Sequence, residues 1–225
     1  MGSQVIFSQT LPKGTFLVKI KVMGKVVGNL GITYEAQGHY DEAERQFFET
    51  LRLREGFWDD ETVWTLSYKS FLARVYRKQK RYEEAELQYL EILPIQRRVD
   101  GDLHWRTLRS VSGLAQVYIC MRKYDEAEEL FTEALESWRK IDESHPGTLR
   151  SKNDLAVLYK EQARYDEAEP LLLEAVEGRR LKLGDTHPHT LESCNNLIKL
   201  YEAWGKPEKA EEWREKLQQT EAVGE

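Results

Sequence analysis

A short acidic motif recurs along the chain, and paired carboxylates of this kind can act as general acids and bases. The motif Tyr-Asp/Glu-Glu-Ala-Glu begins at Tyr40, Tyr82, Tyr124 and Tyr165, and Pro207 begins a divergent copy, so the steps are 42, 42, 41 and 42 residues. A fixed step of this size indicates a repeat architecture in which each unit buries its apolar face against its neighbours. The carboxylates then fall in the first turn of a repeated helix, where the helix dipole favours negative charge. We therefore predict no catalytic residues and no enzymatic activity.

Histidines at two equivalent places could suggest a metal site. They occur in His145-Pro146 and His187-Pro188-His189, but no cysteine or carboxylate cluster converges on them by spacing, and we interpret them as helix-start residues. The sequence contains no glycine-rich phosphate loop, nucleophile elbow or zinc signature. We expect no metal and no cofactor. Cys120 and Cys194 are isolated and are interpreted as reduced thiols that pack as small apolar residues.

Apolar residues recur with the same step and predict the helices that carry the motif. A leucine precedes a tyrosine by four residues in every unit, so the two share one helix face. These pairs are Leu30 and Tyr34, Leu72 and Tyr76, Leu114 and Tyr118, Leu155 and Tyr159, and Leu197 and Tyr201. In four units a small residue follows the leucine and would allow close approach of a second helix: Gly31, Ala73, Ala115 and Ala156.

The spacings Leu-Gly/Ala-x-x-Tyr and Ala-x-x-x-Phe resemble the tetratricopeptide repeat over roughly residues 25 to 217. The period is longer than the common ~34 residues, and it includes connectors such as 141–149 and 183–191. This long form is similar to the kinesin-light-chain class of these repeats. The resemblance implies an all-α fold, a right-handed superhelical α-solenoid of about five antiparallel helix pairs that serves as a binding scaffold.

The same landmarks predict the domain organisation. We expect an irregular lead-in over 1–21, a five-repeat array over 22–219 and a disordered tail over 220–225. The lead-in could instead be the stump of a preceding repeat or domain. Within the lead-in, 16–22 taken alone would be a short strand. The repeats are expected near 22–60, 61–103, 104–145, 146–187 and 188–219. Their first helices are expected near 22–37, 61–79, 104–121, 146–162 and 188–204, and their second helices near 41–55, 83–98, 125–140, 166–182 and 207–219.

Composition narrows the classes of partner. Charged residues make up 32% of the 225 residues and the net charge is −6, which argues against a general nucleic-acid or anionic-membrane binder. The sequence has no run of 18 or more apolar residues, and Met1 to Phe7 lack the pattern of a signal peptide. We expect a cytoplasmic protein without nucleic-acid or membrane partners.

The resemblance implies that the first helices line a concave groove. If the leucines face the stack, residues roughly five and two positions before them, and two and five positions after them, face the groove. Repeats two to four place arginine and lysine there without a carboxylate at the same offsets. The predicted peptide-binding residues are Arg74, Arg77, Arg109, Ser112, Gln116, Arg150, Asn153, Lys160, Asn195 and Lys199.

These observations predict a non-enzymatic scaffold that binds an extended, acidic peptide or partner segment in its groove. Arginine suits such a ligand because its planar fork matches a carboxylate. Two alternatives stay open. The array could instead be a structural, oligomerisation or spacer element of a larger multidomain signalling protein, or of a self-associating chain, without a dedicated ligand. The groove charges could also form only a solvated face with salt bridges inside each helix.

Overall fold

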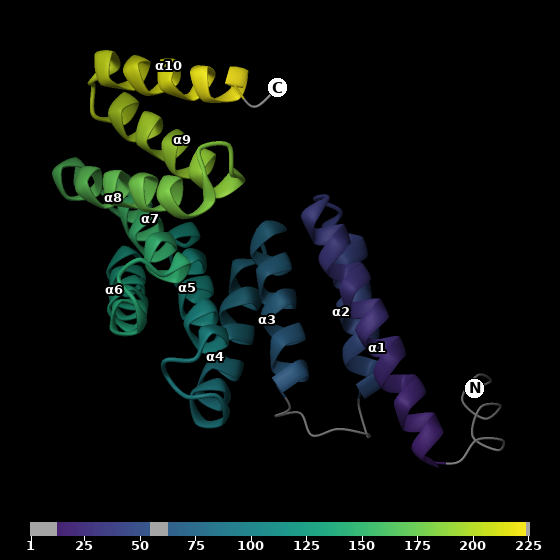
Figure 1. Ribbon diagram of the computed structural model, residues 1–225. Coiled ribbons are helices and arrows are strands. Elements are labelled where there is room, and N and C mark those ends of the chain that lie inside the picture. Colours follow the sequence, from purple (N-terminus) through teal and green to yellow (C-terminus); the bar gives the residue numbers. More distant parts are fainter. Residues whose placement is uncertain (1–12, 55–62, 224–225) are drawn as a thin grey trace. The chain divides into compact units, whose positions relative to one another are not determined.

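The computed structural model describes residues 13–54 and 63–223 (Figure 1). The described residues form ten α-helices and no strand, which confirms the all-α fold class. The chain divides into two compact units, one that ends at Gly101 and one that begins at Asp102. We describe each unit by itself.

The first unit contains two helix pairs. Its helices are α1 (Lys13–Ala36), α2 (Tyr40–Arg54), α3 (Val63–Lys78) and α4 (Tyr82–Val99). Each helix packs against the next one along the chain, and α1 also contacts α3. Pairs are therefore stacked so that the first helices of neighbouring repeats touch.

The second unit continues the pattern with three helix pairs. Its helices are α5 (Trp105–Cys120), α6 (Tyr124–Ile141), α7 (Pro146–Glu161), α8 (Tyr165–Leu183), α9 (Pro188–Ala203) and α10 (Pro207–Val223). Successive helices pack against one another, and the first helices again touch, α5 with α7 and α7 with α9. The first helices thus form one continuous layer of this unit, and this layer carries the site described below.

The repeated small and large apolar residues build the cores between helices. Ala127 and Phe131 of α6 are fully buried and form one cluster with Leu155 and Leu158 of α7. An equivalent cluster contains Leu172 of α8 with residues of α9. Ala127 is 0% exposed within this cluster, so it lies where the helices touch.

The small residue after each leucine has a clear steric reason in the first repeat. A Cβ atom on Gly31 would lie 2.7 Å from Cε1 of the Phe47 ring on α2, closer than real Cβ contacts allow. The alanines that occupy this position in the next three repeats, Ala73, Ala115 and Ala156, are all fully buried. The close approach of the paired helices therefore depends on this position.

The two helices of each pair are joined by a turn whose middle residue has a left-handed backbone conformation. Glycine supplies it at Gly38 and Gly205, with φ of 80° and 71°. In the other three pairs a side chain is forced into this conformation, at Lys80, Arg122 and Ala163, with φ of 65°, 60° and 58°. The turn geometry is conserved even where the favoured residue is absent.

The connector histidines begin helices, as the sequence analysis predicted. The Nδ1 atoms of His145 and His187 accept hydrogen bonds from the backbone N–H groups of Gly147 and His189, at 3.0 and 3.2 Å. His104 caps α5 in the same way. An N-cap acceptor satisfies a backbone donor that the helix leaves unpaired.

The ends of the array differ from the expectation. Helix α1 begins at Lys13, so residues 13–21 are helical rather than irregular; residues 1–12 and the boundary expected at 60/61 lie outside the described residues. Adding a residue to an existing helix is far easier than nucleating one, so weak helix formers join α1. At the other end α10 runs to Val223, so 220–223 are helical rather than disordered, and 224–225 are not described. Its Glu, Lys, Gln and Ala residues favour helix.

Candidate functional site

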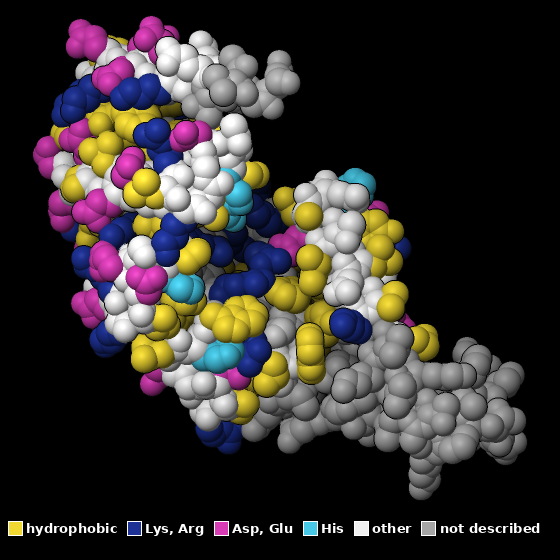
Figure 2. All heavy atoms as spheres, viewed as in Figure 1, with side chains coloured by type: hydrophobic (Ala, Val, Ile, Leu, Met, Phe, Trp, Pro, Cys, Tyr) yellow, Lys and Arg dark blue, Asp and Glu magenta, His cyan; other side chains and the backbone are white. Residues whose placement is uncertain are grey.

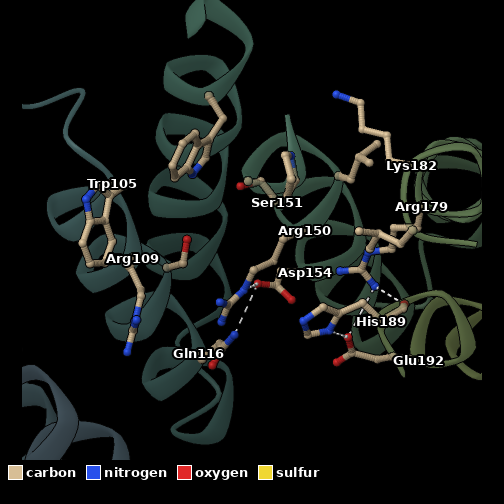
Figure 3. Close-up of a pocket in the computed structure, with 16 residues that line it drawn as sticks. Trp105, Arg109, Gln116, Arg150, Ser151, Asp154, Arg179, Lys182, His189 and Glu192 are labelled. Carbon is tan, nitrogen blue, oxygen red and sulfur yellow. Dashed lines mark hydrogen bonds and ion pairs between the residues drawn. The ribbon is translucent and has the colours of Figure 1, made fainter. Parts of the chain in front are cut away.

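A pocket of about 390 Å³ lies on the layer of first helices of the unit that begins at Asp102 (Figure 3). Its walls come from α5, α7 and α9, with contributions from α6 and α8. Four predicted groove residues line it: Arg109, Ser112, Gln116 and Arg150. The structure therefore brings together residues that the sequence places on two neighbouring repeats.

The orientation of these side chains follows from the buried leucines. Leu114 and Leu155 are 3% and 5% exposed, so they fix which faces of α5 and α7 point into the core. Residues two and five positions from each leucine lie about 140–160° around the helix from it and border the pocket. Ser112 is itself only 5% exposed and lies in the pocket wall, whereas the Arg150 side chain is 51% exposed and reaches its open side.

A carboxylate that the groove prediction missed lies beside Arg150. Asp154 Oδ2 is 3.6 Å from Arg150 Nε and accepts a hydrogen bond of 3.3 Å from Gln116 Nε2. Burial raises the pKa of the Asp154 carboxyl; nearby Arg150 opposes this shift and Glu192 adds to it. The side chain stands one position before Leu155, an offset that the groove rule left out. The groove therefore contains a carboxylate at an offset that the prediction did not consider.

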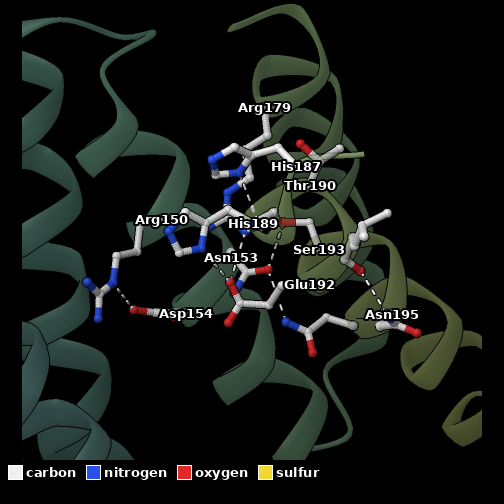
Figure 4. Close-up of polar contacts among 12 residues, drawn as sticks. Arg150, Asn153, Asp154, Arg179, His187, His189, Thr190, Glu192, Ser193 and Asn195 are labelled. Atoms are coloured by element: carbon white, nitrogen blue, oxygen red, sulfur yellow. Dashed lines mark hydrogen bonds and ion pairs between the residues drawn. The ribbon is translucent and has the colours of Figure 1, made fainter. Parts of the chain in front are cut away.

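Arg179 is a second pocket residue that the prediction missed. It belongs to α8, the second helix of its repeat, whereas the prediction considered only first helices. It is 4% exposed, and its Nη1 donates to the His189 carbonyl at 2.6 Å and to Ser193 Oγ at 2.7 Å (Figure 4). Glu192 Oε2 is 3.3 Å from the same atom. Burial lowers the pKa of the Arg179 guanidinium, and Glu192 opposes this. A buried cation thus forms the inner end of the pocket.

Asn153 does not face the pocket, although it was predicted to bind a peptide backbone. It is 2% exposed, and its Oδ1 accepts hydrogen bonds from Ser193 Oγ at 3.0 Å and from Asn196 Nδ2 at 3.1 Å. Its amide therefore ties α7 to α9. Asn195 is exposed and donates to the Leu191 carbonyl of its own helix at 2.9 Å (Figure 4).

The other predicted groove residues lie outside this pocket. Arg74 and Arg77 belong to the first unit, where Arg74 forms a two-pronged ion pair with Glu35 of α1 and lies over the Phe71 ring, 5.1 Å from its centroid. Lys160 Nζ is 2.9 Å from Glu161 Oε1, in an ion pair. Lys199 is exposed on α9 and does not line the pocket. Arg74 and Lys160 are thus engaged by neighbouring carboxylates.

Two tryptophans frame the outer part of the pocket. Trp105 is 49% exposed, whereas Trp138 is 9% exposed and its ring stacks on His145, with centroids 4.5 Å apart and an interplanar angle of 11°. A Cβ on Gly147 would fall 2.4 Å from the Trp138 ring, so glycine is required beside it. Trp138 therefore packs between helices, whereas Trp105 is about half exposed at the rim of the pocket.

Charge elsewhere on this unit is largely paired. Over α8–α10, lysine and arginine side chains lie next to aspartate and glutamate on the surface (Figure 2). Lys209 Nζ is 2.8 Å from Glu169 Oε1, and Lys216 Nζ is 2.7 Å from Glu212 Oε1. The pocket differs from this surface because four cationic side chains line it against the carboxylates of Asp154 and Glu192: Arg109, Arg150, Arg179 and Lys182.

The described residues contain neither a metal-binding cluster nor a membrane-spanning helix. Within 13–54 and 63–223 no group of three histidine, cysteine, aspartate or glutamate side chains is arranged to hold a metal ion. None of the helices in these ranges combines the length and the apolar character that crossing a bilayer requires.

Sequence models of the tetratricopeptide repeat match most of the chain. One model matches residues 61–140, 106–180 and 152–217, and a second matches residues 27–55. A comparison with curated proteins gave no match.

Solved structures with the same fold include a putative kinesin light chain with nearly identical tetratricopeptide-like repeats from Podosopora anserina. It is 26% identical, with a TM-score of 0.71, and the match covers 89% of this chain and 95% of that one. BtubC (BKLC) from P. vanneervenii has a TM-score of 0.74 at 23% identity, over 92% of this chain and 82% of that one. A Rap protein in complex with competence and sporulation factor has a TM-score of 0.79 at 16% identity, over 89% and 54%. At these last two identities the likeness concerns the fold alone.

Proposed function

The chain belongs to the tetratricopeptide repeat family, and we propose that the unit beginning at Asp102 binds an extended acidic segment of a partner protein in its pocket. The observation that carries the proposal is the excess of cationic side chains in a concave site of a protein whose net charge is −6. The family relationship supports a protein-interaction scaffold. The acidic character of the ligand rests on the pocket itself.

Arg150 is suited to reach the ligand. Its side chain is 51% exposed, and at 3.6 Å from Asp154 it makes a loose ion pair rather than a two-pronged one. A guanidinium in this state can turn toward an incoming carboxylate and donate two parallel hydrogen bonds. Arg109 reaches the same pocket from α5, one repeat away.

Arg179 contributes long-range attraction. Its Nη1 atom is already engaged by three acceptors of α9, so it stays in place as a fixed positive charge at the inner end of the pocket. A charge with restricted access to water acts over a longer range than an exposed one. The exposed ring of Trp105 provides apolar surface at the opposite side of the same site.

One protein with the same fold has been solved with a partner bound. The Rap structure that shares this fold was solved as a complex with competence and sporulation factor, which supports a protein-interaction role for this fold. Affinity for one short segment should be modest, because an extended ligand loses conformational entropy when it is ordered.

The test is a binding titration with peptides of opposite charge. A fluorescent hexaglutamate peptide and a hexalysine peptide of equal length are added to the full chain, and anisotropy is followed. We expect the acidic peptide to bind and its affinity to fall between about 0.1 M and about 1 M salt, where the screening length shrinks from about 10 to about 3 Å. Equal binding of the two peptides, or an affinity that salt does not change, would refute the proposed ligand class.

A further inference from the structure

Helix α1 carries a line of apolar side chains that stay exposed among the described residues of its unit, 13–54 and 63–101. The α1 stripe consists of Met23, Val26, Leu30 and Tyr34, whose spacings of three and four residues place them on one face. Met23, Val26 and Leu30 are 53%, 61% and 41% exposed. Contiguous exposed apolar side chains on a helix commonly mark an interaction surface.

The four positions of the α1 stripe recur in every later repeat, and the first three are buried there. They lie seven and four residues before the repeat leucine, at the leucine, and four residues after it. The first three of these positions are at most 5% exposed in all four later repeats: Thr65, Tyr68 and Leu72; Thr107, Ser110 and Leu114; Thr148, Ser151 and Leu155; Thr190, Ser193 and Leu197. The α1 stripe is therefore the uncovered copy of a joining face.

The described interfaces show what covers such a face. Leu155 of α7 lies in one apolar cluster with Phe131 and Leu135 of α6. Leu197 of α9 lies in one with Leu172 of α8. In each case the second helix of the preceding repeat presents large apolar side chains to the stripe of the next one.

A polar contact accompanies each of these apolar ones. The hydroxyl of Tyr159 donates to Glu128 Oε1 of α6 at 3.2 Å, and that of Tyr201 donates to Glu169 Oε1 of α8 at 2.7 Å. Tyr34, their equivalent, stacks on His39 with ring centroids 6.2 Å apart. Its hydroxyl has no hydrogen-bond partner in the part of the chain that the structure describes. In both of the later repeats the acceptor is a glutamate of the preceding second helix.

We propose that the α1 stripe docks a helical hairpin of the same repeat class, supplied by a partner polypeptide. Its second helix must carry a glutamate, a large apolar residue three positions later and an aliphatic one seven positions later. Glu128, Phe131 and Leu135 of α6 have this arrangement and serve as its pattern. The glutamate meets Tyr34 and His39, and the two apolar residues cover Leu30 and Val26.

A second copy of this chain does not fit that description. Helix α10 is the last helix of the described residues, and its residues at the three positions are Glu211, Arg214 and Gln218. Arg214 is held in ion pairs with Glu211 and Glu202. This face of α10 is therefore polar where the α1 stripe needs apolar side chains. The occupant of the stripe is accordingly a different polypeptide and not a second copy of this chain.

An in-register graft tests whether the face accepts such a hairpin. Residues 1–20 of the chain are replaced by a copy of residues 105–145, which brings the copied α6 into the register that it has before α7. Cys120 is changed to serine both at its own position and in the grafted copy. Val26→Cys is then introduced, and its rate of thiol labelling reports whether the α1 stripe is covered. We expect labelling to be slowed at least tenfold by the graft, while Lys25→Cys, on another exposed face of α1, keeps its rate.

Two further variants separate docking from a general gain in stability. Leu30→Ala should leave the melting temperature of the original chain nearly unchanged and lower that of the grafted chain by several degrees. His39→Arg should raise the melting temperature of the grafted chain only, because arginine keeps its charge beside the new glutamate. Equal labelling of Val26→Cys in both chains would overturn the proposal. So would a dimer of the original chain that Leu30→Asp dissociates, since the occupant would then be a second copy.

Discussion

The guanidinium carbon of Arg164 lies 4.0 Å from the centroid of the Tyr159 ring, in a cation–π contact. Its Nη1 atom is also 2.5 Å from Glu128 Oε2 of α6. The first unit repeats the arrangement, with Arg81 4.2 Å from the centroid of Tyr76 and ion-paired to Glu44. One polar clamp between consecutive repeats therefore recurs in both units.

Arg164→Ala should lower the free energy of unfolding by roughly 1–2 kcal/mol, because it removes a cation–π contact and a charged hydrogen bond. Urea denaturation measures the change. Combined with Glu128→Gln, the two effects should be smaller than additive, since both residues belong to one contact. Arg180→Ala, at an exposed ion pair with Asp185, serves as the matched control and should change stability little. Additive effects would argue against the clamp.

The tight helix contact at Ala127 makes a second prediction. Ala127→Leu should destabilise the protein by roughly 1–3 kcal/mol, because a larger side chain overpacks the cluster with Phe131 and Leu155. Ala203→Leu, at the exposed end of α9, is the control and should leave the melting temperature nearly unchanged. An unchanged melting temperature for the Ala127 variant would disprove the assigned contact.

Ala163 occupies the left-handed turn position that glycine holds in other repeats. Ala163→Gly should raise the free energy of unfolding by up to about 1 kcal/mol, because an L side chain is disfavoured at a φ of 58°. The reverse change, Gly205→Ala at a φ of 71°, should lower it by a similar amount. Thermal unfolding of both variants measures the pair. Destabilisation by the glycine would show that its extra freedom in the unfolded chain outweighs the relieved strain.

The period and the registered leucines were sufficient to predict the fold. The helix starts at Pro146, Pro188 and Pro207 agree with prediction, because proline is favoured in the first turn of a helix and marks these starts locally. The predicted ends of the first and last helices were wrong, because α1 begins at Lys13 and α10 ends at Val223. Nothing in the repeat pattern specifies where a terminal helix stops, since that depends on weak propensities and not on the stacking.

The site was predictable only where it follows the repeat. Arg109 and Arg150 stand five positions before their leucines, so one rule placed both in the pocket. Asn153 obeys a similar rule and is nevertheless buried, because Ser193, 40 residues away, engages its carbonyl. Arg179 enters the pocket from a second helix. Contacts across two repeats decide these cases, and single-helix geometry does not reveal them.

Asp154 should be costly to stability in its ionised form. Burial raises its pKa in the folded protein, so the fold binds this proton more tightly than the unfolded chain does. The Asp154 contribution to stability should therefore increase as pH falls from neutral through the folded pKa, and level off below the ordinary aspartate pKa of about 3.9. Asp154→Asn should remove this dependence and raise stability at pH 7, as urea denaturation at a series of pH values would measure.

The same variant predicts a change in ligand binding. Asp154→Asn removes a negative charge beside Arg150 and keeps an oxygen that accepts from Gln116. Hexaglutamate should bind several-fold more tightly to this variant at low salt and show a smaller gain at high salt, as fluorescence anisotropy would reveal. Weaker binding to the variant would mean that Asp154 positions Arg150 for the ligand.

The central claim, that the pocket binds an acidic segment through Arg109 and Arg150, is tested most directly by reversing both charges. Arg109→Glu with Arg150→Glu is titrated with fluorescent hexaglutamate beside Arg45→Glu with Arg52→Glu, which changes the net charge equally on exposed positions of α2. We predict that the pocket variant loses binding, that the α2 variant retains most of it, and that helicity is unchanged in both. Equal affinity of the two variants would contradict the account.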